Sequence, residues 1–386
     1  MNRPRTQSRQ RAWMLGFWWS QVAFLAALIA VPAVADLIRD PRPRLPRFDT
    51  EPIHIGPLHD NPLLVTDDQL TAVLKKLEPR LRHSQPKINY VDHALRFWGV
   101  DATFKDPECL SGEELRRLLV DHKAFQAAWG KDTKPLMSLR NGLVAVRMQQ
   151  GNATASHVDH TLASLAECGT PLDFDLSLPG QMVPLRSLLA SAIARFEINQ
   201  QEYEWTTLAA ALYAVDGAPW YSADGERIDF NRCARRLMRQ QFQQGVCYGN
   251  HRLYTLVMLL RIDEQKPLLD EATRVEIGDH LREATRRLVA SQSQEGFWDQ
   301  NWPDAKAAAR DEKLDTPLSR RILATGHALE WWAMAPAEFH PPREVLIRAG
   351  QWLAKEIDGM DSPAIEKNYT FLSHAGRALR LWRSGT

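Results

Sequence analysis

The sequence predicts an all-α protein with one N-terminal transmembrane helix. Three observations lead to this class. Apolar residues recur at helical spacing over most of the chain after Thr66, alternation with a period of two is rare, and a long uncharged stretch lies near the N-terminus. With 386 residues, 44% of them hydrophobic, the chain can bury a large core. Its net charge of +1 predicts no general attraction to nucleic acid.

Residues 1–35 are expected to anchor the chain in a membrane. Residues 12–35 carry no charge and exceed the roughly 20 apolar residues that span a bilayer. Arginines precede the stretch, which predicts a cytoplasmic N-terminus and a periplasmic or extracellular remainder. Because Ala33 and Ala35 also fit a signal-peptide cleavage site, a cleaved segment and a secreted protein are the alternative.

Residues 36–62 are expected to form an extended stalk. Prolines are interleaved with arginines throughout this segment, and proline-rich segments are semi-rigid. Residues 63–184 are then expected to form a small helical region, and residues 185–386 a larger helical domain.

Helix starts in the small region carry clear capping signals. Thr66 with Gln69, and Ser111 with Glu114, each fit a capping box ahead of apolar periodicity. A further helix is expected after Ser156, ending at Gly169. A loop over 171–184 follows.

The larger domain is expected to consist of paired helices with short connections. Asn199 and Glu202 are expected to cap the second of them. The apolar periodicity places the helices near 185–198, 200–214, 229–243, 246–262, 271–291, 319–335, 342–357 and 366–383.

One helix exit carries a recognisable motif. Gln292, Gly296 and Trp298 form the pattern Q-x3-G-x-W, which resembles the QW element of squalene–hopene cyclases, prenyltransferases and related α/α-toroid proteins. The resemblance implies an α/α-toroid-like domain over 185–386, with helical hairpins around a central cavity. The D-x-D-D cluster that those cyclases use is absent, so cyclisation chemistry gains no support.

Cys247 and His251 are the first candidate site. A cysteine and a histidine four residues apart share one helix face, where they suit zinc ligation or a thiolate–imidazole pair. Cys247-Tyr-Gly249 resembles the zinc-binding segment of lanthionine-synthetase cyclases, which implies zinc as the metal. The alternative is a packed cysteine beside a hydrogen-bonded histidine.

Two further candidates lie near expected helix starts. His157 and His160 share a face around Asp159, as a metal or acid–base site requires. The alternative is that Asp159 caps the helix and both histidines are exposed. Glu204 lies between Tyr203 and Trp205, where burial would raise its pKa and suit it to general acid–base work. A solvated first turn is the alternative.

His327 is the last candidate. Gly326-His327 with Glu330 and Trp331 resembles the G-H-x-x-E-W segment of N-acylglucosamine 2-epimerase-type toroids, which implies proton transfer by histidine. Ser373-His374 resembles the second histidine of that family. The alternative is a polar pair within a tryptophan-rich wall.

These candidates predict a membrane-anchored envelope enzyme with its pocket on the toroid axis. The expected mechanism is proton transfer by histidine and glutamate, with zinc as a possible cofactor and saccharide or isoprenoid-like substrates. The sequence leaves a second class open, a non-catalytic envelope scaffold or a module that binds a ligand or partner. P-loop, dinucleotide, zincin and α/β-hydrolase motifs are absent.

Overall fold

The computed structural model describes residues 17–22, 24–25, 44–82, 86–222, 224–307 and 317–383. Contacts divide the chain into two units, Met1–Pro43 and Arg44–Thr386. Residues 17–22 are helical, and most of the expected transmembrane segment lies outside the described residues. Where the chain is described, no helix combines the length and the apolar character that a membrane span needs.

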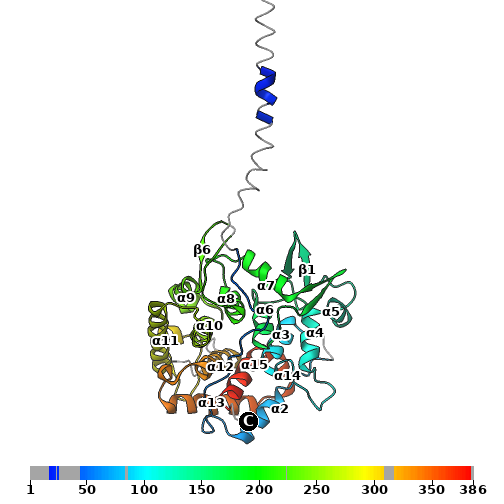
Figure 1. Cartoon of the computed structure of the whole chain (residues 1–386). Coiled ribbons are helices and arrows are strands. Elements are labelled where there is room, and N and C mark those ends of the chain that lie inside the picture. The colour runs from blue at the N-terminus through cyan, green and yellow to red at the C-terminus, as the bar shows by residue number, and fades with distance from the viewer. Residues whose placement is uncertain are drawn as a thin grey trace, which may run out of the picture. The chain divides into compact units, whose positions relative to one another are not determined.

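The larger unit is mostly helical, as the sequence predicts, and its described residues contain a closed ring of six helices. Each helix of the ring packs against the next, and the last packs against the first. Figure 1 shows their labels around the middle of the unit. In order around the ring they are α3 (Ile88–Trp98), α6 (His160–Glu167), α8 (Tyr203–Tyr213), α10 (Asn250–Asp263), α12 (Leu318–Met334) and α15 (Tyr369–Leu381).

Other helices surround this ring. Among them, α4 packs on α3, α7 on α8, α11 on α9 and α10, and α13 on α12. One face of α8 lies toward the ring interior and the other lies beneath the outer layer. Every residue of α8 is buried as a result. The outer helices are α2 (Asp67–Lys76), α4 (Gly112–Val120), α5 (His122–Trp129), α7 (Leu185–Ala194), α9 (Phe230–Arg239), α11 (Glu271–Ser291), α13 (Arg343–Asp358) and α14 (Ser362–Lys367).

Strands are few and short, as expected. The described residues hold three antiparallel pairs, and the expected loop 171–184 contains one of them. The pairs are β1 (Met137–Arg140) with β2 (Leu143–Val146), β3 (Asp175–Leu178) with β4 (Gln181–Pro184), and β5 (Trp220–Tyr221) with β6 (Arg227–Ile228).

Both expected capping boxes are confirmed. The hydroxyl of Thr66 accepts from the amide of Gln69 at 3.3 Å, and the Gln69 side chain accepts from the Thr66 amide at 3.0 Å. Ser111 and Glu114 form the same reciprocal pair at 3.3 and 2.8 Å. These bonds satisfy amides that the first turn of a helix otherwise leaves unpaired.

The QW element joins the end of α11 to the start of α13. The Gln292 amide donates to the carbonyls of Gly296 and Val345, both at 2.9 Å. The indole N–H of Trp298 donates to the Leu288 carbonyl at 2.7 Å. Gly296 adopts φ 110°, and a Cβ there would lie 2.6 Å from the Arg348 carbonyl oxygen. The motif therefore holds the turn that follows α11 against the start of α13, which is its neighbour in the outer layer.

The expected divisions at 62/63 and 184/185 do not separate compact units. Residues 44–62, expected as stalk, lie within the larger unit. The amides of Asp49 and Ile53 donate to carbonyls at the end of α8, and the amide of Asn61 donates to the Trp382 carbonyl, all at 2.8 Å. The ring itself takes α3 and α6 from residues 63–184 and its other four helices from residues 185–386.

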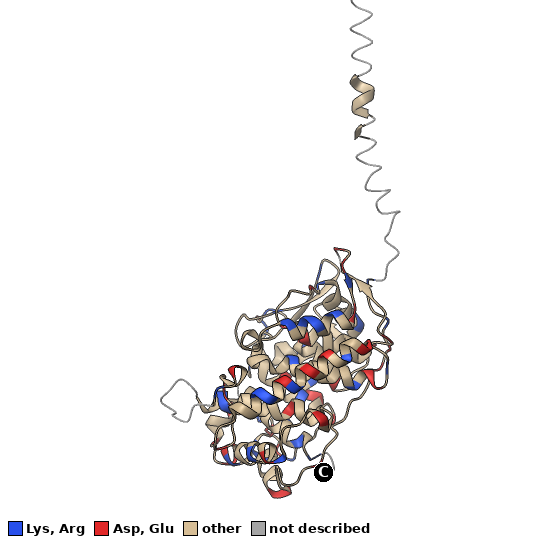
Figure 2. Cartoon of the chain, turned by 90° about the vertical axis from the view of Figure 1, so that its left-hand side faces the viewer, with Lys and Arg blue, Asp and Glu red and all other residues tan. Residues whose placement is uncertain are grey.

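Basic and acidic residues are interspersed over the helical unit (Figure 2), in agreement with the near-zero net charge. Inside the ring, α12 and α15 pack closely at Gly326. A Cβ at that position would lie 2.9 Å from the Cα of Ala375. This small-residue contact brings together two adjacent residues, His327 after Gly326 and His374 before Ala375.

Candidate functional site: a histidine cluster inside the ring

Six histidines gather inside the helical ring. Five of them belong to different ring helices, and the sixth, His157, lies shortly before α6. All are buried to 3% exposure or less except His157, whose side chain is 17% exposed. They are His93 on α3, His157 before α6, His160 on α6, His251 on α10, His327 on α12 and His374 on α15.

The imidazole rings form a continuous cluster. Ring centroids are 3.9 Å apart for His327 and His374, and 4.4 Å apart for His93 and His160. His251 lies 4.7 Å from His327, and His93 lies 4.9 Å from His374. His157 is 5.9 Å from both His160 and His251. The sequence candidates His157, His160, His251 and His327 are therefore brought together.

Five of the six histidines have Nδ1 within hydrogen-bonding distance of an oxygen. An Nδ1–H that donates to such an oxygen leaves Nε2 unprotonated, which is the arrangement found in histidines that bind metals. The acceptors are the Asn89 carbonyl for His93 (2.7 Å), Asp92 for His160 (2.9 Å), Glu202 for His157 (2.8 Å), and Glu330 for both His327 (3.1 Å) and His374 (3.3 Å).

Several nitrogens of the cluster have no partner among the described residues. Nε2 of His160, Nε2 of His327 and both ring nitrogens of His251 are buried without a hydrogen bond. A buried polar group without a partner costs about 1–3 kcal/mol. Such a concentration of unpaired nitrogens indicates a place where a further group binds.

Cys247 lies beside two of these histidines. Its sulfur and the ligand atoms of His251 and His327 all lie within 4.8 Å of one another. The expected continuous helix through Cys247 is wrong, since α10 begins at Asn250 and Cys247 adopts left-handed φ 50° in a 3-10 turn, Val246–Gly249. The Asn250 side chain donates to the Cys247 carbonyl at 2.9 Å and holds this turn.

Electrostatics keep part of the cluster neutral. Burial holds the pKa of His93, His251 and His374 well below the ordinary value of 6.5, and neighbouring histidines lower it further. For His374, the histidine that lowers the pKa most is His327. Burial raises the pKa of the Cys247 thiol. Neutral imidazoles are ready to ligate, whereas the thiol needs a cation beside it to lose its proton.

A layer of paired charges follows the histidines. Arg96, Glu330 and Arg377 lie one helical turn after His93, His327 and His374, respectively. Glu330 accepts from both Arg96 and Arg377. Because the histidines meet at one level and these charges at the next, α3, α12 and α15 run in the same direction. Arg96 donates to Glu167 at 2.6 Å and to Glu330 at 2.7 Å, and Arg377 donates to Glu167 at 3.1 Å.

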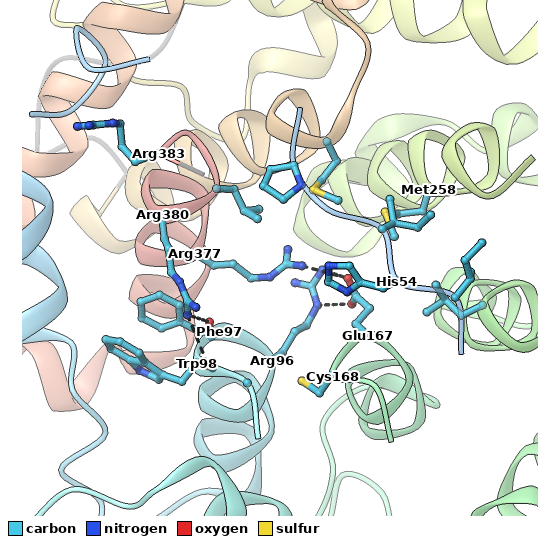
Figure 3. A pocket seen from close by; sticks show the side chains of 17 residues that line it. His54, Arg96, Phe97, Trp98, Glu167, Cys168, Met258, Arg377, Arg380 and Arg383 are labelled. Atoms are coloured by element: carbon cyan, nitrogen blue, oxygen red, sulfur yellow. Dashed lines mark hydrogen bonds and ion pairs between the residues drawn. The ribbon is translucent and has the colours of Figure 1, made fainter. Parts of the chain in front are cut away.

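A pocket of about 510 Å³ lies beyond this charged layer, toward the C-terminal ends of the ring helices. Figure 3 shows Arg96 and Arg377 pointing at Glu167, with His54 beside them. Of the arginines that line this pocket, Arg96 and Arg377 pair with Glu167 and Glu330. Arg383 pairs with Asp60, and Arg380 donates to the backbone carbonyls of Phe97 and Trp98.

A second pocket, of about 570 Å³, lies near the N-terminal ends of α8 and α10. Glu202 and Glu204 line it, together with Gly245 and Val246, which directly precede Cys247. Glu202 connects it to the cluster through its bond to His157. Glu204 is 2% exposed, and burial raises its pKa to about 7. This side chain can therefore hold or release a proton near neutral pH.

The expected cap by Asn199 and Glu202 is wrong, and so is the alternative in which Asp159 caps α6. Glu202 does not pair with Asn199; it adopts φ 57° before α8, and its carboxylate accepts from Nδ1 of His157 and from the amide of Val158. Asp159 lies before α6 at φ 54° without capping it, and instead accepts from the hydroxyl of Thr206 at 2.6 Å. Both carboxylates serve contacts between helices rather than helix starts.

His93, Asp92 and Glu167 were not among the sequence candidates. A degenerate repeat could have found His93, because four ring helices carry a histidine followed two residues later by leucine. The pairs are His93 with Leu95, His160 with Leu162, His251 with Leu253 and His327 with Leu329. This spacing places the histidine inside the ring and the leucine in the packing around it.

Comparison with protein-family models, curated proteins and solved structures finds no match for this chain.

Proposed function

We propose that this chain is a metal-dependent enzyme whose centre lies inside an α/α-toroid. The single observation that carries the proposal is the convergence of Cys247, His251 and His327 within 4.8 Å, with buried ring nitrogens that lack partners. The closed ring of six helices inside an outer helical layer supports the toroid assignment.

Zinc is the metal that this ligand set favours. Cysteine and histidine are its common ligands, and catalytic zinc sites use three protein ligands with a fourth position open. Tetrahedral zinc separates its ligand atoms by about 3.4–3.6 Å. The ligand atoms here lie within 4.8 Å of one another, and zinc binding would draw them to that shorter separation. Glu330 would hold His327 from behind, as carboxylates do for metal-bound histidines.

Proton transfer would fall to the glutamates of the 570 Å³ pocket, which Glu202 links to the cluster through His157. When bound, zinc would supply an activated water as a nucleophile near neutral pH. Glu204, with its pKa of about 7, can exchange a proton with a substrate in this pocket, and Glu202 with His157 forms a second acid–base pair. Convergence supports an enzyme over the alternative of a non-catalytic scaffold or binding module.

Metal analysis tests this proposal. We expect the purified full-length chain to contain about one zinc per molecule, and the C247S and H251A variants to contain almost none. Cys233→Ala is the matched control, because Cys233 is a buried cysteine on α9 outside the cluster. A wild-type protein that takes up no metal, or a C247S variant that retains it, would refute the proposal.

We also propose that residues 12–35 anchor the chain in a membrane, with the helical unit in the periplasm or outside the cell. The uncharged apolar stretch and the arginines before it support this. Fractionation of cells that produce the full chain tests it. Recovery in the soluble cytoplasmic fraction would contradict it, and a secreted shortened form would support the cleaved alternative.

A further inference from the structure

The 570 Å³ pocket beside the histidine cluster has an unusual lining. Its lining residues come from three segments: the start of α8 and the residues before it, the stretch from the end of α9 to the turn before Cys247, and the first turn of α10. Val246 is the only aliphatic side chain among its lining residues, and no aromatic ring lines it. Such a wall gives an isoprenoid chain little to pack against, although pockets of about 300–1,000 Å³ suit small molecules.

Three arginines face this pocket without acidic partners. Arg236 and Arg239, one turn apart on α9, form no hydrogen bond or salt bridge within the described part of the chain. Arg252 is 2% exposed, and its guanidinium donates to the carbonyls of Gln241 (2.8 Å) and Phe242 (3.5 Å) while its Nη1 has no partner.

The neighbouring arginines of the same helix behave differently. Arg232 pairs with Glu226, and Arg235 pairs with Glu276 at 3.0 Å and with Asp270 at 3.3 Å. On one face of α9, Arg232 and Arg235 therefore pair with acids. On the other face, Arg236 and Arg239 line the pocket without a salt bridge among the described residues. Arginines with their charge uncompensated in a concave site are typical of carboxylate or phosphate recognition.

The acids of the pocket offset the charge of these arginines only in part, through the electrostatic interaction of Glu204 with the buried Arg252. The Glu202 carboxylate is occupied by Nδ1 of His157 at 2.8 Å and by the amide of Val158 at 3.0 Å. Glu204 is buried, and its pKa of about 7 leaves it partly protonated at neutral pH. The pocket therefore retains a net positive charge that an anionic ligand would offset.

Side-chain amides make up much of the remaining lining. An amide offers both a donor and an acceptor and can pair with two adjacent hydroxyl groups. Within the described residues, the side chains of five of these amides form no hydrogen bond, so they are available to a ligand. They are Asn199, Gln201, Gln240, Gln241 and Gln244.

We propose that this pocket binds an acidic saccharide, a sugar that carries a carboxylate or a phosphate. Arg236, Arg239 and Arg252 hold the anionic group, and the amides hold the hydroxyls. The sugar then lies beside Glu202 and Glu204 and next to the turn that carries Cys247. The proposal names the substrate class of the proposed function and rests on that function only for the reaction, since binding itself needs no metal.

Calorimetric titration of the full-length chain tests the proposal with four probes: glucuronate, glucose 6-phosphate, glucose and inorganic phosphate. We expect glucuronate or glucose 6-phosphate to bind at least tenfold more tightly than glucose and inorganic phosphate. R236Q and R239Q should each weaken this binding about 10-fold or more, because a charge-assisted contact is lost. R235Q is the matched control and should bind as the wild type does.

Three outcomes would overturn the proposal. Equal affinity for glucose and glucuronate would remove the role of the arginines. Equal affinity for phosphate and glucose 6-phosphate would remove the role of the amides. Equal weakening in R235Q and R236Q would show a general charge effect. Titration with and without a chelator separates this test from the zinc proposal, because sugar binding should persist in metal-free protein.

Discussion

Oε2 of Glu330 lies 3.1 Å from Nδ1 of His327, so one carboxylate links the histidine cluster to the charged layer beneath it. Its other oxygen accepts from Arg96 at 2.7 Å and from Arg377. Burial alone would raise the pKa of Glu330, but Arg96 and Arg377 hold it well below its ordinary value. Glu330 is therefore an ionised acceptor that orients His327.

Replacement of Glu330 by glutamine should weaken zinc binding. A neutral amide orients the imidazole less firmly, and loss of such a partner commonly reduces metal affinity 10–100-fold. Glu167→Gln is the matched control, because Glu167 shares Arg96 and Arg377 with Glu330 but contacts no histidine of the cluster. Both variants should lose about 3–5 kcal/mol of unfolding free energy. Zinc titration should separate them, and equal zinc affinities would argue against the role of Glu330.

Replacement of His251 by leucine should stabilise the metal-free protein. Both ring nitrogens of His251 are buried without partners, so an apolar side chain of similar volume removes a penalty of about 1–3 kcal/mol. H251L should also lose the stabilisation that zinc gives the wild type. Urea unfolding with and without zinc measures both effects. H93L is the control and should be destabilised, because His93 donates to the Asn89 carbonyl.

Glu204 should make stability decline as the pH rises. Its folded pKa of about 7 exceeds the ordinary 4.5, so the folded state binds more protons between these values. Unfolding free energy should fall by about 3 kcal/mol across pH 4.5 to 7, and E204Q should lack this component. Glu202 should have the opposite effect on stability, because the bond to His157 outweighs burial and lowers its pKa. The E202Q variant should therefore lose a contribution to the unfolding free energy that grows as the pH rises. Identical pH profiles for wild type and E204Q would contradict the assignment.

Gly296→Ala should destabilise the QW turn by more than the backbone angle alone explains. Gly296 combines φ 110° with a Cβ position 2.6 Å from the Arg348 carbonyl oxygen. Gly142 has φ 77° but open space around its Cβ position. We expect thermal unfolding to show a loss of about 1 kcal/mol for G142A and at least about 3 kcal/mol for G296A. Equal losses would show that contact with Arg348 contributes nothing.

Local sequence signals located most of the helices in the C-terminal half. The expected helix 271–291 coincides with α11, which begins after the side-chain cap of Asp270. The range 319–335 differs from α12 by one residue at each end. The expected helix 366–383 is interrupted at Asn368, because α14 ends at Lys367 and α15 begins at Tyr369. Apolar periodicity reports the buried face of α15, whereas α14 has no buried residue and leaves no such signal, so the break between the two helices was not registered.

The candidate site was anticipated only in part. Cys247 and His251 were expected to meet along one helix face, but a left-handed turn before α10 places the cysteine instead. Glu202 was assigned to a cap because its spacing from Asn199 fits one. The stronger attraction of His157, 45 residues earlier in the chain, takes the carboxylate away from that role.

Composition and periodicity alone establish a helical protein with short, sparse strands, since each helix depends on caps and apolar spacing within a few residues. The grouping of six histidines inside one ring was settled only by the tertiary structure. Most contacts between the imidazoles join helices that lie far apart in the chain. Two Nδ1 partners are local, since His93 bonds to Asn89 and His327 to Glu330 within a few residues, whereas His157, His160 and His374 reach Glu202, Asp92 and Glu330 on other segments. The contacts between segments depend on how whole helices pack, so no local window of the sequence contains them.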